Sequence, residues 1–380
     1  MSQTGDPSDQ PINGVHSDQL ALFNKGDDLF SAPLMEADGL GPLFTRTACS
    51  DCHNEGKRGP AGVRKMVVVE ADGKTPAADQ SKLIWGHTVR PLTGGGATTP
   101  ILPPTDDPSV RVSLRTGPPI FGRGFMEAVA DSEIERMAQE QSTRSDGIHG
   151  RVNHVIFNSV PNPDTTFNDF HTGDLLIGRF GDKARIASLD EFAADALQGD
   201  MGITSPMRPT ELPNPDGLTD DAKPGVDVGM DSINLRAMYV RLNAVPKRAD
   251  NPAGAKLFAA ANCSVCHAPA LHTRSDYPIA QLSGTTAAVY TDMLLHDLGD
   301  GLADSMVDID GEAGPRDWRT APLVGVRFAT TFLHDSRAHS VRDAIGAHAS
   351  PGSEANESVD RFNALSASEQ QALIDFVSGL

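Results

Sequence analysis

The feature that most constrains this chain is a five-residue pattern, C-x-x-C-H, that occurs twice. The stretches "ACSDCHNEG" (48–56) and "NCSVCHAPA" (262–270) contain it, and they hold all four cysteines. A dithiol redox motif needs no adjacent histidine, and a zinc site pairs its cysteines with a second ligand pair nearby in the chain. Attachment of a c-type haem uses every residue of the pattern, because two thiols join the porphyrin and the histidine binds the iron. We therefore predict two covalent c-type haems, with thioether bonds from Cys49, Cys52, Cys263 and Cys266 and iron ligation by His53 and His267.

The charge balance narrows the classes of partner. The 380 residues carry a formal net charge of -19 at pH 7, whereas binding to nucleic acids or anionic membranes requires a basic surface. We expect no nucleic acid as a partner, and no membrane span, because no apolar run approaches the length that crosses a bilayer. An acidic surface suits a basic small redox protein, a cytochrome or a cupredoxin, as electron donor.

The expected location follows from the chemistry of attachment. Covalent haem attachment takes place on the oxidising, exported side of a bacterial membrane. The start "MSQTGDPSDQ" has neither basic nor apolar signal-peptide character. We therefore expect Met1 to stand in place of a removed export signal and the protein to work in the periplasm.

The placement of the two motifs in different halves of the chain favours two haem domains in tandem. We expect a mainly α-helical fold, with an N-terminal haem domain that carries loop insertions (1–245) and a C-terminal cytochrome c-like domain (246–380). The 36 glycines and 27 prolines predict long irregular loops and a few short strands.

The C-terminal half carries the clearest helix signals. Asn251 can cap a helix that begins at Pro252, just before the second motif. Near the chain end, Ser366 and Glu369 form a capping box ahead of apolar residues at helical spacing. In small cytochromes a helix before the haem motif crosses a helix at the C-terminus, and we expect these two helices to do the same.

A segment from about residue 57 to 120 is rich in Pro, Gly and Thr. It predicts a long loop with short strands such as "RKMVVVEADG". Either this segment is a surface insertion, or it forms a wall beside one haem.

Each haem iron has a sixth position, whose occupant separates an electron carrier from a catalyst. For the second haem we predict His348 as the iron ligand. In "SVRDAIGAHAS", Ser340 can cap a helix. The apolar face of that helix then carries Val341, Ala344, Ile345 and His348. The alternative is a core histidine satisfied by other partners.

The sixth position of the first haem has two candidate states, ligation by His87 or an open position that admits peroxide or oxygen. Glu127 lies near Gly122 and Gly124, which allow close backbone approach, ahead of a helix that we expect to be capped near Ser132. A carboxyl group beside an open iron can move a proton between the two oxygens of peroxide, so we predict Glu127 as a catalytic residue. The alternative is a solvated charge at the helix entry.

Several segments together resemble a known family. They are "GLGPLFTRTACSDCH", "FGRGFMEAVAD", "GRFGDKA", "GDMGITSP", "LLHDLGDGLAD", "WRTAPL" and "FLHDSRAHSVRDAIGAH", in the family order. The chain is similar over nearly its whole length to bacterial di-haem oxidoreductases. These are relatives of the di-haem cytochrome c peroxidases and of the di-haem enzyme that matures tryptophan tryptophylquinone. The resemblance implies chemistry at the N-terminal haem and electron transfer through the C-terminal haem.

The chain departs from the family pattern at three positions. His348 stands where the peroxidases have methionine and the quinone-maturing enzyme has tyrosine, which predicts a bis-histidine haem of lower potential. No histidine follows His53 closely, where the peroxidases carry a distal one. Met126 replaces their inter-haem tryptophan, which leaves Trp85 and Trp318 as possible relays. A calcium ion between the haem domains is usual in the relatives, but no compact acidic loop identifies its ligands in this chain.

These observations predict a periplasmic di-haem c-type oxidoreductase that is peroxidase-like. Hydrogen peroxide or oxygen would bind at the N-terminal haem opposite His53, with Glu127 managing protons, and electrons would arrive through the haem held by His267 and His348. One alternative is a non-catalytic electron-transfer di-haem cytochrome, and another is an oxidase that modifies a partner protein. An open iron separates the two catalytic functions from the electron carrier.

Overall fold

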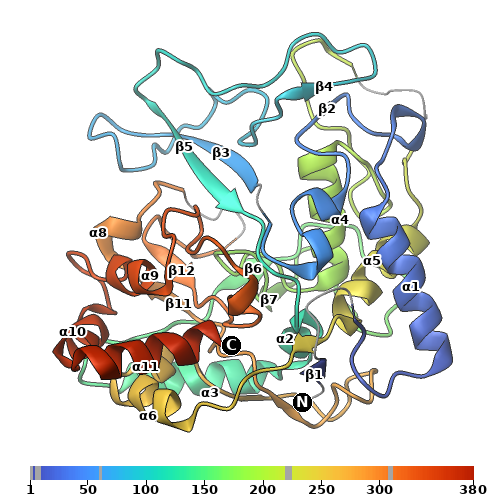
Figure 1. The fold of residues 1–380 in the computed structure, drawn as a ribbon. Helices are drawn as coiled ribbons and strands as arrows, with labels where there is room; N and C mark the ends of the chain where they lie inside the picture. Colours follow the sequence, from blue (N-terminus) through green and yellow to red (C-terminus); the bar gives the residue numbers. More distant parts are fainter. Residues whose placement is uncertain (1–2, 5–9, 60–61, 219–224, 307–310) are drawn as a thin grey trace.

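The computed structural model describes residues 3–4, 10–59, 62–218, 225–306 and 311–380, so Met1 lies outside it. The predicted mainly helical fold with a few short strands is confirmed, and irregular segments connect the elements (Figure 1). The helices are α1 (Ser17–Ser31), α2 (Arg123–Ala128), α3 (Asp131–Ser142), α4 (Leu189–Met201), α5 (Met230–Leu242), α6 (Pro252–Ala260), α7 (Cys263–Cys266), α8 (Gly299–Leu302), α9 (Val341–Ala347), α10 (Asn356–Ala364) and α11 (Ala367–Ser378).

The strands of the described residues pair two by two and form no large sheet. One pair is parallel, β1 (Gln3–Thr4) with β8 (Val245–Pro246). The antiparallel pairs are β2 (Leu43–Phe44) with β4 (Leu92–Thr93), β3 (Gly62–Val68) with β5 (Val110–Thr116), β6 (His154–Ile156) with β7 (Leu175–Ile177), β9 (Leu271–His272) with β10 (Thr286–Ala287), and β11 (Leu295–Asp297) with β12 (Asp317–Arg319).

The predicted helix boundaries in the C-terminal half are confirmed. The Asn251 side chain accepts a hydrogen bond from the Gly254 amide at the start of α6. Ser340 accepts one from the Asp343 amide at the start of α9. Ser366 forms the predicted capping box at the start of α11. These caps were predictable because each uses a side chain within three residues of the amide that it satisfies.

Two pairs of helices cross in close contact at a glycine. In α1, a Cβ atom on Gly26 would lie 2.3 Å from the Leu235 carbonyl oxygen of α5. In α6, a Cβ atom on Gly254 would lie 2.4 Å from Cβ of Phe376 in α11. The predicted crossing of the pre-motif helix with the C-terminal helix is therefore confirmed, and the first half of the chain contains a crossing of the same construction.

Each crossing places a phenylalanine ring between an aromatic side chain and a motif histidine. The Phe30 ring lies 5.0 Å from the Tyr239 ring and 6.1 Å from the His53 ring, measured between centroids. In the second half, the Phe258 ring lies 5.4 Å from Phe376 and 6.4 Å from His267. The same contact therefore orients both motif histidines against a helix crossing.

The segment from about 57 to 120 is built around the β3–β5 ladder, which runs from the Gly62–Thr116 pair to the Val68–Val110 pair. Figure 1 shows this ladder and the β2–β4 pair at the top of the view, away from α6 and α11. The two ends of the segment, unlike the ladder, reach the interior. Arg58 at one end and Pro118 and Pro119 at the other line the cavity described below. The segment is thus an outer layer whose ends reach an internal site.

The largest buried cluster draws on both sides of the predicted boundary at residue 245. It packs Phe23, Phe125 and Tyr239 with Leu271 and Val289, among others. The division into domains 1–245 and 246–380 stays a prediction.

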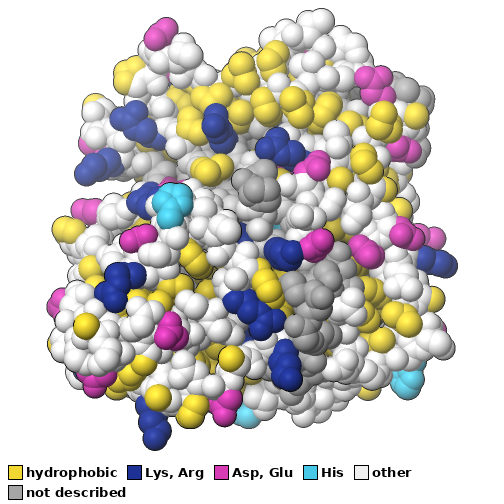
Figure 2. All heavy atoms as spheres, in the orientation of Figure 1, with side chains coloured by type: hydrophobic (Ala, Val, Ile, Leu, Met, Phe, Trp, Pro, Cys, Tyr) yellow, Lys and Arg dark blue, Asp and Glu magenta, His cyan; other side chains and the backbone are white. Residues whose placement is uncertain are grey.

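The face of the molecule in Figure 2 carries acidic and basic side chains interspersed, with apolar side chains between them. No helix in the described part of the chain is long and apolar enough to cross a membrane.

We predict that Gly254→Ala lowers the free energy of unfolding by about 1–3 kcal/mol, because the added methyl group must push α6 away from α11. The matched control is Gly199→Ala in α4, where an added Cβ meets no atom within 4 Å. That change should stabilise the protein by about 0.5–1 kcal/mol through helix propensity. Denaturant unfolding of the holoprotein measures both values, and equal effects of the two changes would contradict the packing argument.

Candidate haem-binding sites

The second motif folds as the short helix α7, and its cysteines line a cavity. Asn262, in the left-handed conformation, starts the turn, and the His267 amide bonds to the Cys263 carbonyl oxygen at 3.0 Å. The His267 ring places Nδ1 3.2 Å from the carbonyl oxygen of Tyr290. Burial lowers the pKa of His267 to about 4, so the ring is neutral at pH 7. Since Nδ1 donates to the carbonyl, Nε2 retains its lone pair for a metal.

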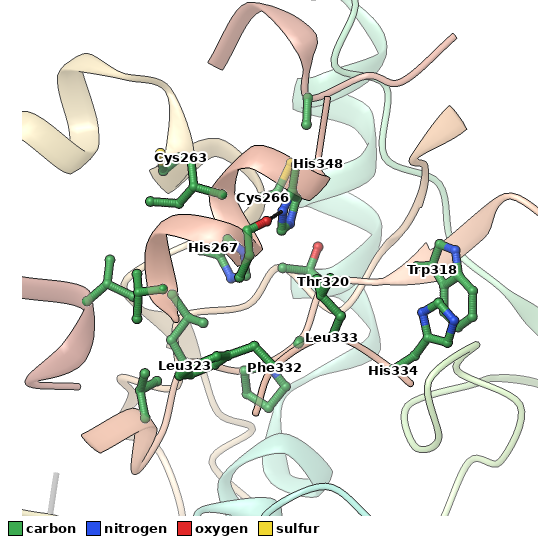
Figure 3. A pocket seen from close by; sticks show the side chains of 18 of the residues that line it. Cys263, Cys266, His267, Trp318, Thr320, Leu323, Phe332, Leu333, His334 and His348 are labelled. Atoms are coloured by element: carbon green, nitrogen blue, oxygen red, sulfur yellow. Dashed lines mark hydrogen bonds between the residues drawn. The ribbon is translucent and has the colours of Figure 1, made fainter. Parts of the chain in front are cut away.

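The cavity has a volume of about 280 Å³. Its lining is mainly apolar and includes side chains from α6, α9, α10 and α11, together with Cys263, Cys266, His267 and His348. Figure 3 shows the two cysteines, His267 and His348 grouped on one side of this space, and Trp318 and His334 on another.

His348 lies at the C-cap of α9, directly after Ala347, and it lines the cavity. Val341, Ala344 and Ile345, its partners in the helical pattern, line the same cavity. The His348 ring places Nδ1 2.6 Å from the Ala344 carbonyl oxygen, which leaves Nε2 as the acceptor. Burial lowers the pKa of His348 as well. The structure thus brings His267 and His348 to one cavity, each with Nε2 as the nitrogen left for iron.

The first motif forms a tighter turn than the second. Cys49–Asp51 is a 3-10 turn, held by the Asp51 carboxylate, which accepts hydrogen bonds from the Thr47 and Ala48 amides at 3.1 Å. His53 repeats the arrangement of His267, with Nδ1 2.7 Å from the Pro118 carbonyl oxygen and a pKa that burial lowers to about 4.

No disulfide joins any of the four cysteines, all of which lie in the described residues. Burial raises the pKa of Cys52 to about 11 and that of Cys263 to about 12, and it also raises the pKa of Cys49 and Cys266. A reactive dithiol needs a lowered thiol pKa, so these side chains do not suit redox exchange as thiolates. Cys263 and Cys266, which line the apolar cavity, do suit thioether attachment.

The structure places His87 within the outer β layer. Its ring Nδ1 lies 2.9 Å from the Met66 carbonyl oxygen, and the neighbouring Val89 belongs to a cluster with Leu43, Met66 and Ile101. That cluster is separate from the two that contain Cys49. The ligand role of His87 stays a prediction.

The structure places Glu127 inside α2, in a buried ion pair. Arg241 Nε and the Tyr277 hydroxyl each donate to Oε2 at 2.6 Å, and Arg241 and the Leu189 amide donate to Oε1 at 3.0 and 2.9 Å. Burial alone would raise the pKa of Glu127, but Arg241 and the other donors hold it below its usual value.

Two expectations about this region were wrong. Glu127 is not a solvated charge at a helix entry, because its side chain is buried. The following helix, α3, begins at Asp131 after Ala130, so Ser132 lies inside the helix rather than at its cap. The tight turn between α2 and α3 was hidden in the sequence because Ala130 caps α3 without a side-chain oxygen.

The sequence analysis missed a buried histidine beside the second motif. His296 Nε2 lies 2.9 Å from Asp292, and its Nδ1 lies 2.7 Å from Glu354 and 3.6 Å from Cys266 Sγ. Burial would lower the pKa of His296, but Cys266 and Asp292 raise it well above its usual value. Because carboxylates occupy both ring nitrogens, His296 does not suit a haem iron. His296 lies in the segment "LLHDLGDGLAD". Its role could not be predicted from that segment alone, because its partner Glu354 lies 58 positions further along the chain.

Among the described residues, Cys266, Asp292 and His296 form the one group of three side chains that lie close enough to hold a metal ion. A thiol and an imidazole do not suit calcium, which prefers oxygen ligands. The calcium ion expected between the haem domains therefore stays a prediction without assigned ligands.

Comparison with known families decides the class of the protein. A family model described as "Di-haem oxidoreductase, putative peroxidase" matches residues 105–380. The chain belongs to the di-haem oxidoreductase family. It is therefore an enzyme, and haem cofactors are implied for it. The second motif, His348 and the cavity lie mostly within the matched residues, and the first motif precedes them.

Two solved structures resemble this oxidoreductase at 13% sequence identity. Hydrazine synthase from Kuenenia stuttgartiensis, pressurised with xenon, has a TM-score of 0.41, with 100% of this chain and 96% of that chain covered. The Y463M variant of the di-haem peroxidase BthA from Burkholderia thailandensis E264 has a TM-score of 0.35, with 91% and 74% covered. Both TM-scores are low, so neither likeness bears on the function of this oxidoreductase. No curated protein matches the chain.

We predict that Glu127→Gln destabilises the oxidoreductase by about 3 kcal/mol, because Arg241 loses one of its two buried carboxylate partners. Tyr277→Phe, which removes one hydrogen bond to the same carboxylate, should cost about 1 kcal/mol. Denaturant unfolding at pH 7 measures both.

The pH dependence tests the same ion pair. The pKa of Glu127 is lowered on folding, so its contribution is present at neutral pH and is lost as the pH falls below about 4, the usual range of a free glutamate. Wild type should therefore lose more stability on acidification than Glu127→Gln does. Equal acid sensitivity of the two proteins would contradict the assignment.

Proposed function

We propose that this oxidoreductase is a peroxidase-like enzyme that holds one c-type haem at each C-x-x-C-H motif and reduces hydrogen peroxide, or activates oxygen, at the N-terminal haem. The observation that carries the proposal is the shared geometry of His53, His267 and His348. Each ring gives Nδ1 to a backbone carbonyl oxygen and keeps Nε2 as an acceptor. Such carbonyl contacts fix the tautomer and the ring orientation of metal-binding histidines. Thioether bonds from Cys49, Cys52, Cys263 and Cys266 would hold the haems.

The second site suits electron transfer. His267 and His348 line one cavity, so a haem there would have two histidines within reach of its iron. Bis-histidine ligation gives a lower potential than histidine and methionine. A small redox protein, a cytochrome or a cupredoxin, is the proposed donor to this haem, with the enzyme in the periplasm.

The first site is the proposed place of chemistry, opposite His53. The bound haem would supply the iron at which peroxide is reduced, and the chain must supply a proton. Glu127 does not suit this step, because four donors surround its carboxylate and hold it ionised. We assign Glu127 to positioning, since it joins α2 to α5 through Arg241.

Asp200 is the better candidate for the proton. It lies at the end of α4, and the Thr45 amide, just before the first motif, bonds to its carbonyl oxygen at 2.7 Å. Burial raises the pKa of Asp200. Burial also raises the pKa of Cys52, with a smaller contribution from the nearby Asp200. A carboxyl group near the first motif can give a proton to a peroxide oxygen.

We predict that Asp200→Asn lowers the turnover of peroxide by about 100-fold or more, the usual contribution of a general acid. The assay uses the holoprotein, loaded with both haems, with a small chemical electron donor. Asp216→Asn is the control, since this exposed aspartate accepts hydrogen bonds from Thr98 and Thr99 of the outer layer. Turnover within twofold of wild type in Asp200→Asn would remove Asp200 from the mechanism.

The ligand assignment has its own test. Electron paramagnetic resonance of the ferric holoprotein should show a low-spin signal from the haem held by His267 and His348. We predict that His348→Ala converts this signal to high spin and that His348→Met raises the potential of this haem, because thioether ligation favours the ferrous state. An unchanged low-spin signal in His348→Ala would overturn the assignment.

The electron paramagnetic resonance signal of the other haem, at the N-terminal motif, distinguishes a catalyst from an electron carrier. A high-spin signal from the N-terminal haem means an open iron, as a peroxidase or an oxidase of a partner protein requires. Two low-spin signals would favour an electron carrier, or an enzyme that opens only after half-reduction.

A further inference from the structure

The loop that carries His348 rests on the segment that joins β11 to α8. This loop spans residues 348–355 and leads from α9 to α10. An antiparallel bridge pairs Leu298 of the segment with Ser353 of the loop. The Ser350 hydroxyl also donates to the Leu298 carbonyl oxygen at 3.1 Å. The backbone of the loop is therefore fixed to the end of β11.

An ion pair between His296 and Glu354 joins the same two parts of the chain. Nδ1 of His296, in β11, lies 2.7 Å from Oε2 of Glu354, in the loop. The Asp297 amide donates to Oε1 at 3.2 Å, and the His149 amide donates to Oε2 at 3.0 Å. The side chains of His296 and Glu354 are 3% and 16% exposed, so solvent screens their interaction little.

His296 is fixed on its other side by the core. Its Nε2 lies 2.9 Å from the carboxylate of Asp292, which is fully buried and accepts a hydrogen bond from Gln141 at 2.8 Å. Nδ1 of His296 also lies 3.6 Å from Sγ of Cys266. One imidazole ring therefore contacts both the attachment cysteine and the loop that carries His348.

The loop transmits this contact to His348 through a neighbouring serine. His348 directly follows the last residue of α9, where carbonyl groups need partners from outside the helix. The Ser353 hydroxyl donates to the His348 carbonyl oxygen at 2.6 Å, and its oxygen accepts from the Ala355 amide at 3.1 Å. Because Glu354 lies between Ser353 and Ala355, a shift of its side chain would disturb the backbone position of His348.

We propose that His296 and Glu354 are positioning residues that hold His348 at the iron of the C-terminal haem. Figure 3 shows His348 beside Cys266 and His267 at the cavity. With the ion pair intact, the loop keeps the imidazole in place, which closes this iron to peroxide and confines the chemistry to the N-terminal haem. The proposal rests on the proposed function, since it takes His348 as an iron ligand.

The test is a carbon monoxide titration of the reduced holoprotein. Carbon monoxide competes with His348 for the iron, and the binding step that His348→Ala strengthens is the one that reports this displacement. In Glu354→Gln the affinity of that step should rise about tenfold, because a hydrogen bond between charged groups is lost. An affinity within about twofold of wild type would overturn the proposal.

Glu357→Gln is the matched control. It makes the same substitution in the first turn of α10, where Glu357 pairs with Arg361 at the surface. This change removes one negative charge from the same part of the chain but leaves the loop and β11 in contact. The affinity for carbon monoxide should stay unchanged, and a rise equal to that of Glu354→Gln would contradict the role of the ion pair.

A double variant distinguishes positioning from a general loosening of the cavity. In His348→Ala there is no imidazole for carbon monoxide to displace, so adding Glu354→Gln should cause no further rise in affinity. A further rise of about tenfold in the double variant would show that Glu354 acts independently of His348, and it would overturn the proposal.

If Glu354→Gln yields no folded holoprotein, Gly299→Ala gives the same test from the other side of the contact. A Cβ atom on Gly299 would lie 2.3 Å from Oγ of Ser350 and 2.7 Å from the Pro351 carbonyl oxygen, so it must push the loop away. Carbon monoxide should bind more tightly in this variant. Gly346→Ala in α9 is its control, because a Cβ atom there meets no atom within 4 Å, and equal affinities in the two variants would overturn the proposal.

The His348→Ala variant also separates this proposal from the proposed function. If His348→Ala strengthens carbon monoxide binding and Glu354→Gln does not, the ligand assignment stands and the positioning role is overturned. If His348→Ala keeps the low-spin signal and the carbon monoxide affinity of wild type, both the ligand assignment and the positioning role are overturned.

Discussion

Both candidate haem sites depend on a contact between two helices that a single glycine permits. Gly26 lets α1 lie against Leu235 and Tyr239 of α5, and Gly254 lets α6 lie against Phe376 of α11. At these distances any side chain would separate the helices. Because the helices touch, Phe30 and Phe258 are held against the motif histidines, and the histidine rings meet their carbonyl partners. The orientation of each proposed iron ligand therefore begins with the absence of one Cβ atom.

Buried charge is arranged in two different ways around these sites. In the first arrangement, opposite charges are paired within the core. Glu127 is paired with Arg241, and His296 is paired with Asp292 and Glu354. These pairs join segments that are distant in sequence, and breaking one would leave an unpaired charge in the interior. In the cavity of the second motif, by contrast, cations meet carbonyl oxygens.

The features that could be predicted from the sequence are those whose partners are local. The caps at Asn251, Ser340 and Ser366 and the face of α9 that carries His348 each depend on residues within one or two helical turns. Glu127 was read differently, because its partners Arg241 and Tyr277 are more than a hundred positions away and no local pattern announces them. The same holds for Arg58, Arg123 and Arg319, which line one cavity from three separate segments. Spacing predicts which residues share a helix face, but only the fold decides which charges meet.

The outer β layer explains why the two halves of the chain are hard to separate. Its ladder lies away from α6 and α11, so it resembles a surface insertion, and yet both of its ends enter the interior. One end carries Arg58 after the first motif, and the other carries Pro118 and Pro119. A shift in the loop of the first motif would therefore move a charge and a wall of the second cavity, because Arg58 contacts Leu333 and Ser336, which lie 275 and 278 positions further along the chain. Two sites built on separate helix crossings are thus joined by one segment, and the electrostatic environment of the second includes a residue from the first.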